Sequence, residues 1–257
     1  MWFDAHCHLG WFADPVAAAL EAKREGLGLL AVTVTPEEFL ALRSHLSGEK
    51  DGAGAGEKNV ALAAGLHPWW VRDAADADAL CELVPRVRFV GEVGLDAAPR
   101  HAGTWEAQLA AFELICRACA ESSEPVAPKV LSVHAVRAAG AALDVLERTG
   151  AAASCRCVLH WFSGTSEELW RAVRLGCRFS LGERALATRR GREYARVLPA
   201  EALLAETDLP GAPGAGGGAA LIEASLARAV AGVARARGIE EDHARELLSG
   251  NATVLLA

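Results

Sequence analysis

The chain carries histidines and carboxylates at the ends of short apolar runs that are typical of β-strands. Five of its eight histidines stand there, namely His6, His8, His67, His134 and His160. Glu92 ends another such run, and Asp208 follows a further one. Burying this many polar groups without partners costs many kcal/mol, and a bound cation removes that cost. These residue types therefore predict a metal site.

The His6-Cys7-His8 segment is the strongest local signal. Because side chains alternate along a strand, both imidazoles face one side and Cys7 faces the other. Histidine and carboxylate ligands without thiolates suit Zn or Mn, with Mg also possible. Six candidate ligands exceed the four of a structural zinc, which favours two divalent ions that activate water and share Glu92. The predicted ligands are His6, His8, Glu92, His134, His160 and Asp208.

Strand and helix patterns alternate along the whole chain, which predicts βα units and a parallel sheet. The expected helices include one opened by Asp14-Pro15 and another opened by a capping box at Thr165. Glycine-rich stretches at Ser47–Gly56 and Gly211–Gly218 are expected to be loops. Eight expected strands within 257 residues favour one domain, 1–257, folded as a closed (β/α) barrel with its site at the carboxyl ends of the strands. The expected strands are Trp2–Ala5, Leu27–Val34, Val60–Gly65, Arg88–Val93, Lys129–Val133, Cys157–Leu159, Arg178–Leu181 and Leu203–Ala205.

Composition argues against a protein that wraps duplex DNA. The net charge is −7, whereas non-specific DNA affinity comes mainly from neutralising phosphates. Any contact with nucleic acid is therefore expected to be local. One basic cluster stands out, and we favour a solvated loop and helix face for it. It comprises Arg184, Arg189, Arg190, Arg192 and Arg196.

The sequence predicts a cytoplasmic protein without a membrane segment. Its N-terminus lacks the basic and apolar stretches of a secretion signal, and no long uncharged apolar run follows. Seven cysteines, an odd number, favour reduced thiols. Cys116 and Cys119 lie in an expected helix, Gln108–Glu121, and are interpreted as structural.

Seven motifs, in register from the N-terminus to Asn251, resemble those of the TatD family of metal-dependent deoxyribonucleases. They are Phe3-Asp4-Ala5-His6-Cys7-His8-Leu9, Gly65-Leu66-His67-Pro68, Gly91-Glu92-Val93-Gly94-Leu95-Asp96, Gln108 with Phe112, Val133-His134-Ala135-Val136-Arg137, Leu159-His160-Trp161-Phe162-Ser163-Gly164 and Leu204-Ala205-Glu206-Thr207-Asp208-Leu209-Pro210. The resemblance implies a distorted TIM barrel, (β/α)8-type, of the metal-dependent hydrolase kind. It also implies hydrolysis of phosphodiester bonds, often as an exonuclease or in DNA repair.

The resemblance further implies how the ligands are shared. His6, His8 and Asp208 would hold one ion, His134 and His160 the other, with Glu92 between them. Two segments depart from the family pattern. Ala97-Ala98-Pro99 stands where the family usually has an aromatic residue, and Leu209-Pro210-Gly211 replaces a small residue followed by Pro-Tyr. Both departures bear on substrate choice and leave the predicted ligands intact.

The predicted catalytic residues are Asp208 and Glu92. We hypothesise that metal-activated water attacks phosphorus while Asp208 positions that water and accepts its proton. His67 and Arg137 are candidates for binding phosphate, Arg137 because its planar guanidinium matches phosphate oxygens. The substrate expected is single-stranded or end-bound DNA, or a small phosphodiester. Three tryptophans flank the expected rim and could stack on unpaired bases, although tryptophan at such positions more often packs in the core; they are Trp69, Trp70 and Trp161.

Two alternatives remain open at this stage. One is a metal-dependent amidase, lactonase or deaminase on the same barrel. Related barrels often use a carboxylated lysine where this chain has Glu92, which favours phosphodiesters. The other is a catalytically silent, metal-binding barrel protein, and the full ligand set argues against it.

Overall fold

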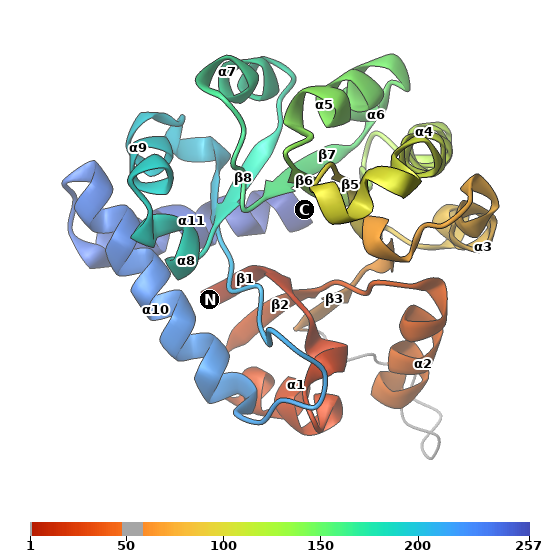
Figure 1. Cartoon of the computed structure of the whole chain (residues 1–257). Helices are drawn as coiled ribbons and strands as arrows, with labels where there is room; N and C mark the ends of the chain where they lie inside the picture. Colours follow the sequence, from red (N-terminus) through yellow and green to blue (C-terminus); the bar gives the residue numbers. More distant parts are fainter. Residues whose placement is uncertain (1, 48–58) are drawn as a thin grey trace. The chain divides into compact units, whose positions relative to one another are not determined.

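The computed structural model describes residues 2–47 and 59–257 (Figure 1). They form two compact units, each made of several chain segments. The first unit contains residues 1–32, 37–62 and 180–254, and the second contains 33–36, 63–179 and 255–257. Apart from Ser47, the predicted loop Ser47–Gly56 lies outside the described residues. The predicted single domain, 1–257, stays a prediction.

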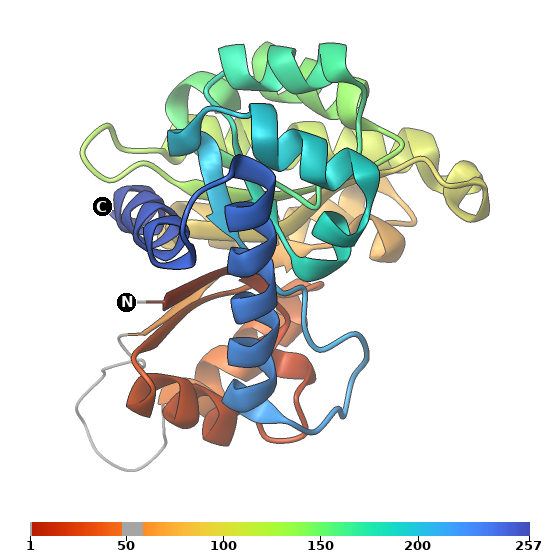
Figure 2. The same cartoon turned by 90° about the vertical axis from the view of Figure 1, so that its left-hand side faces the viewer.

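The first unit contains three parallel strands in the order β1-β2-β3, with Trp2 beside Leu27 and Leu29 beside Val60. Helix α10 runs alongside α1, as Figure 2 shows. The elements are β1 (Trp2–Cys7), α1 (Pro15–Arg24), β2 (Leu27–Ala31), α2 (Pro36–Ser47), β3 (Val60–Leu62), α8 (Glu183–Ala187), α9 (Arg189–Val197), β9 (Leu203–Ala205), α10 (Gly218–Arg237) and α11 (Glu241–Leu256). Pro36 and the last residues of α11 belong to the second unit.

Local sequence explains where the first helix begins and ends. The Asp14 side chain accepts a hydrogen bond from Ala17 N at 2.8 Å, and Pro15 fixes the first helical residue. The helix is followed by Gly26 at φ 67°, a conformation that glycine adopts at little cost. The predicted start of this helix at Asp14-Pro15 is confirmed.

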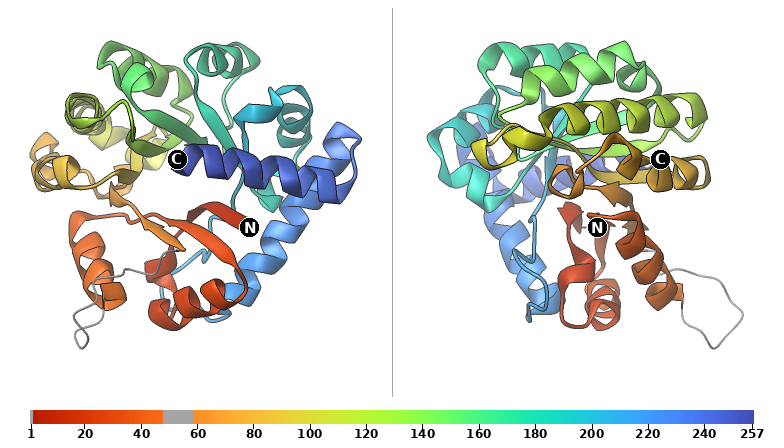
Figure 3. Two further views of the ribbon diagram at one scale, coloured as in Figure 1. Left: turned by 180° about the vertical axis from the view of Figure 1, so that it is seen from behind. Right: turned by 45° about the vertical axis from the view of Figure 1, so that its right-hand side comes forward.

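The second unit contains parallel strands in the order β4-β5-β6-β7. Helices α4, α5 and α7 lie on the same side of these strands (Figures 1 and 3). The elements are β4 (Ala64–Leu66), α3 (Asp78–Leu83), β5 (Phe89–Asp96), α4 (Trp105–Ser122), β6 (Val130–Val136), α5 (Ala139–Arg148), α6 (Ala151–Ser154), β7 (Arg156–His160), α7 (Ser166–Arg174) and β8 (Arg178–Leu181), whose last residues belong to the first unit.

Each of the eight predicted strands is present, but one of them is divided into two shorter strands. The predicted strand Val60–Gly65 is two strands, β3 and β4, separated by Ala63. The Ala63 carbonyl accepts a hydrogen bond from Thr33 Oγ1 at 2.9 Å. A carbonyl bound to a side chain is diverted from the strand ladder, which accounts for the break. Of the other glycine-rich stretch, Gly218 already belongs to α10.

Two predictions about thiols and membranes can be compared with the structure. All seven cysteines are free thiols, and Cys116 and Cys119 are buried on α4. Burial raises the pKa of both thiols well above the usual range, as expected for inert structural cysteines. Among the described residues, no helix has both the length and the apolar character needed to cross a membrane.

Candidate metal centres

The first unit brings His6, His8 and Asp208 together. His6 lies near the end of β1, His8 follows it, and Asp208 follows β9. Asp208 Oδ1 lies 3.7 Å from His6 Nε2 and 3.4 Å from His8 Nε2. The carboxylate is 22% exposed, whereas the two imidazoles are buried. Three of the predicted ligands therefore converge, and the Asp208 side chain is partly open to solvent.

Asp4 holds the backbone beside this cluster in place through hydrogen bonds. Its Oδ1 accepts hydrogen bonds from His6 N at 3.1 Å and Thr207 N at 3.0 Å, and its Oδ2 accepts from Thr207 Oγ1. Burial raises the pKa of Asp4 to about 7, although hydrogen bonds from Thr207 and His6 oppose the rise. Asp208 N also donates to His6 O at 2.9 Å. These bonds tie Thr207 and Asp208 to β1, the strand that carries His6 and leads into His8.

Replacing Thr207 with valine is expected to lower the free energy of unfolding by about 1–3 kcal/mol. Valine keeps the shape of threonine and removes a hydroxyl whose loss leaves the buried Asp4 carboxylate short of a donor. Urea denaturation followed by circular dichroism measures the effect. The control is Thr253→Val, since that hydroxyl binds Ser249 O on an exposed helix face. Equal losses in the two variants would contradict this role of Thr207.

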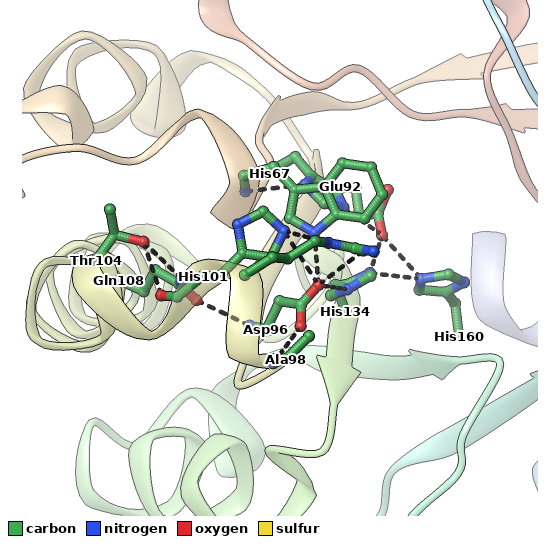
Figure 4. Close-up of polar contacts among 11 residues, drawn as sticks. His67, Glu92, Asp96, Ala98, His101, Thr104, Gln108, His134 and His160 are labelled. Carbon is green, nitrogen blue, oxygen red and sulfur yellow. Dashed lines mark hydrogen bonds and ion pairs between the residues drawn. The ribbon is translucent and has the colours of Figure 1, made fainter.

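The second unit gathers three imidazoles around one oxygen of Glu92 (Figure 4). Glu92 Oε1 lies 2.6 Å from His134 Nδ1, 2.8 Å from His160 Nε2 and 3.4 Å from His67 Nε2. The facing nitrogens of His134 and His160 are 3.2 Å apart. Glu92, His134 and His160 come from the neighbouring strands β5, β6 and β7, and His67 follows β4. All four side chains are buried.

His67 differs from His134 and His160 in that a backbone contact decides which of its ring nitrogens carries the proton. Its Nδ1 accepts a hydrogen bond from Trp69 N at 3.1 Å, which places the proton of the neutral ring on Nε2. A ring nitrogen of His67 lies within 4.8 Å of possible ligand atoms of Glu92 and His134. Because Nε2 carries the proton, however, it donates a hydrogen bond and does not coordinate a metal ion. This geometry supports the predicted role of His67 in binding phosphate.

His134 is held between two carboxylates. Its Nδ1 faces Glu92, and its Nε2 lies 3.7 Å from Asp96 Oδ2. Burial lowers the pKa of His134, but attraction to Glu92 and Asp96 and the hydrogen bond with Glu92 outweigh it and raise the pKa to about 9. Burial opposes ionisation of Asp96, yet hydrogen bonds from Trp69 Nε1 and Ala98 N and attraction to His134 hold its pKa below the usual range. Asp96 therefore orients the ring so that Nδ1 points at Glu92.

Backbone contacts fix the two carboxylates of β5. Thr33 N donates to Gly91 O at 3.0 Å, and Glu92 N donates to Thr33 O at 2.9 Å. Asp96 N donates to Gln108 Oε1 at 2.8 Å, which links the strand to α4 (Figure 4). Glu92 and Asp96 are thus positioned before any ion binds.

Gly94→Ala is expected to destabilise the protein by about 3 kcal/mol or more. Gly94 pairs with His134 in the strand ladder at φ 142°, and an added Cβ would lie 2.0 Å from His134 O. The matched control is Gly176→Ala, because Gly176 shares a positive φ of 78° but has open space around it. Thermal and urea denaturation compare the two variants. Similar stability losses would show that the close approach to His134 matters little.

The donor sets of both clusters fit a divalent cation. In the second cluster, ring nitrogens of His134 and His160 lie within 2.8 Å of Glu92 Oε1 and 3.2 Å from each other, so three atoms that can each bind a cation face one another. A cation placed among such donors replaces the protons that otherwise hold them together. No thiolate competes, since Cys7 Sγ faces Leu30 O. Each unit contains three of the predicted ligands, and the sharing of Glu92 by both ions stays a prediction.

Arg137 and Trp161 adopt strained backbone at the ends of β6 and β7. Their φ angles are 52° and 40°, and Asp208 has a φ of 58°. The left-handed region costs such residues about 1–3 kcal/mol, and this strain concentrates at functional sites. Arg137 is exposed, as a phosphate-binding residue must be.

The basic cluster of the first unit has local partners. Arg196 pairs with Glu193, and Arg192 Nη1 donates to the carbonyls of Leu186 and Ala187. The five arginines of this cluster are exposed on α8 and α9. The arrangement fits the solvated helix face that the sequence favoured.

Sequence reasoning did not single out Asp4 or Asp96 as functional. A signal was present for both, because Asp4 lies two residues before His6 and Asp96 lies four residues after Glu92. Residues at even spacings share one face of a strand. Each carboxylate therefore belongs on the same face as a predicted ligand.

Comparison with known proteins decides the family. The family model described as "TatD related DNase" matches residues 3–257. The chain belongs to the TatD family. The predicted resemblance is therefore confirmed, and it extends over nearly the whole chain.

Curated TatD relatives match this chain at moderate identity. The "3'-5' ssDNA/RNA exonuclease TatD" of Citrobacter rodentium is 33% identical over 154 residues, which span 57% of this chain and 56% of that protein. This match thus covers little more than half of that relative's length. The "Putative deoxyribonuclease TATDN3" of Mus musculus is 27% identical, over 97% of this chain and 86% of its own length.

Solved structures of TatD proteins share the fold. A TatD homologue from Escherichia coli aligns with a TM-score of 0.77 at 22% identity, covering 99% of this chain and 97% of its own. A TatD family hydrolase from Entamoeba histolytica aligns with a TM-score of 0.75 at 15% identity, covering 99% and 97%. The predicted α/β fold of the distorted TIM-barrel type is confirmed. The described strands form a three-stranded and a six-stranded sheet, so the closed barrel expected from the sequence stays a prediction.

Proposed function

We propose that this TatD protein is a metal-dependent hydrolase that cleaves phosphodiester bonds of DNA, with Asp208 and Glu92 as catalytic carboxylates. The observation that carries the proposal is the gathering of His134, His160 and His67 within 3.4 Å of Glu92 Oε1. Membership of a family of DNases supports the phosphodiester as substrate. The names of the curated relatives support a single-stranded or end-bound nucleic acid, or a small phosphodiester, as the class of substrate.

The proposal includes two divalent ions, Zn, Mn or Mg. His6, His8 and Asp208 would hold one ion, and His134 and His160 would hold the other with Glu92. Such ions, when bound, polarise a phosphoryl group and lower the pKa of water. Asp96 keeps His134 in the orientation that presents Nδ1, and Asp4 holds the segment before Asp208.

The chain's own residues then supply the proton transfer and the grip on phosphate. Asp208 accepts the proton of the attacking water, and its carboxylate is the most exposed group of its cluster. His67 donates from Nε2 to a phosphate oxygen, since its Nδ1 is already bonded to Trp69 N. Arg137 offers its guanidinium to the same phosphate. We also propose a cytoplasmic location, which the seven free thiols support.

The test is a panel of substrates given to the purified protein with Zn, Mn or Mg. It contains single-stranded DNA, RNA, a chromogenic phosphodiester, and several amides and lactones. We expect hydrolysis of DNA and of the chromogenic phosphodiester only in the presence of metal. Turnover confined to amides or lactones would favour the alternative hydrolase class, and metal binding without any turnover would favour a silent metal-binding protein.

A further inference from the structure

Trp69 is an exposed aromatic side chain anchored at both of its nitrogens. Its backbone N donates to His67 Nδ1 at 3.1 Å, and its indole Nε1 donates to Asp96 Oδ2 at 2.5 Å. The residue is nevertheless 44% exposed, and the neighbouring Trp70 is 40% exposed. Trp69 and Trp70 are adjacent in the chain, and contiguous exposed apolar surface marks a binding site more often than a single exposed side chain does. Its anchors leave the ring little freedom to lose when a ligand binds.

Flat and cationic groups surround this indole. The His101 ring stacks on Trp69 with centroids 5.4 Å apart, and Trp70 stacks on it at 6.3 Å. The Arg100 guanidinium carbon lies 4.7 Å from the Trp69 ring centroid, and the Arg100 side chain is 64% exposed. Stacked aromatic rings beside an arginine are the means by which proteins bind unpaired nucleobases and the adjoining phosphates.

The same contacts place this surface beside the proposed chemistry. Asp96, which accepts from Trp69, also orients His134, and His67 is bonded to the Trp69 backbone. The rings of Trp69 and His67 lie 4.8 Å apart between centroids. A base stacked on Trp69 therefore has its sugar and phosphate within reach of His67 and of the Glu92 cluster.

We infer that Trp69, supported by His101 and Arg100, is a stacking subsite for an unpaired terminal nucleobase. The inference rests on the proposed hydrolysis of nucleic acid and names the part of the substrate that this chain recognises. It predicts that the protein distinguishes a terminal nucleotide that carries a base from one that is abasic. Trp69 is a specificity-determining residue and does not take part in proton transfer.

The experiment measures binding by the metal-loaded protein to a short phosphorothioate oligonucleotide that resists cleavage. It carries either 2-aminopurine or an abasic site at one terminus, and versions modified at each terminus are compared. For the wild type, we expect quenched 2-aminopurine fluorescence and affinity about tenfold higher than for the abasic form at one terminus. Trp69→Ala is expected to lose both effects, with unchanged metal content.

Two further variants separate stacking from structure. Trp69→Phe keeps an aromatic face without the indole N–H, and we expect it to retain the preference for a terminal base. Trp170→Ala is the matched control, because Trp170 is an indole of similar exposure, 41%, on the helix α7. Loss of the preference in Trp69→Phe or in Trp170→Ala would overturn the inference.

If Trp69→Ala fails to fold, binding measurements on the wild-type protein alone still test the stacking subsite. Equal affinity for the intact and abasic oligonucleotides at both termini would overturn the stacking subsite. If unmodified DNA is still hydrolysed in that case, the proposed function stands and only this inference fails. Absence of both binding and hydrolysis would overturn the two together.

Discussion

Asp208→Ala is expected to lower kcat/KM for hydrolysis of single-stranded DNA by about 10³-fold, within the range for loss of a positioned proton acceptor. The Asp208 carboxylate faces both His6 and His8, is the most exposed group of its cluster, and sits on strained backbone at φ 58°. Its loss removes a ligand and the group that accepts the water's proton. Steady-state kinetics with added Mn measure the effect.

Two controls accompany this variant. Asp242→Ala removes an exposed carboxylate from α11 of the same unit and is expected to leave kcat/KM unchanged. Circular dichroism establishes that both variants fold. Activity of Asp208→Ala within about tenfold of the wild type would remove Asp208 from the proposed chemistry, since general-base catalysis contributes more than that.

Glu92→Gln is expected to lower kcat/KM for hydrolysis of single-stranded DNA by about 10³-fold, and also to lower the metal content of the protein. The amide keeps the size of the carboxylate but removes the charge at the point where His134, His160 and His67 converge. Without that charge, a divalent ion loses a ligand and His134 loses the attraction that raises its pKa. Breaking such a buried charge pair also costs about 3–5 kcal/mol in stability.

Kinetics and metal analysis by mass spectrometry follow this variant together. Glu82→Gln is the control, because Glu82 is an exposed residue of α3 in the same unit. We expect the control to keep full activity and full metal content. A Glu92→Gln protein that retains both the wild-type metal content and more than a tenth of the activity would exclude Glu92 as ligand and catalyst.

The sequence predicted which side chains lie close together because the relevant geometry is local, whereas their role as metal ligands stays a prediction. A strand alternates its faces every residue, so His6 and His8 were expected on one side; in the structure His6 lies on β1 and His8 follows its last residue, and both face Asp208. Parallel neighbouring strands present their carboxyl ends together, so Glu92, His134 and His160 had to approach one another. Both expectations depend only on spacing and on recognising the strands.

Other features depend on contacts between segments far apart in the chain. The break at Ala63 comes from the Thr33 hydroxyl, 30 residues away. The proton of His67 is placed by the Trp69 backbone, and Asp96 is held by Gln108 from α4. A hydrogen bond of this kind leaves no periodic pattern in the sequence, which is why strand boundaries and supporting residues needed the structure.

The proposed function depends most on each of the two clusters binding its own divalent ion. The direct measurement is the metal stoichiometry of the purified protein after dialysis against Zn or Mn, for the wild type and two double variants. We predict about two ions per chain for the wild type, and about one for His6→Ala/His8→Ala and for His134→Ala/His160→Ala. Unchanged metal content in either folded double variant would contradict the proposal that each cluster binds one ion.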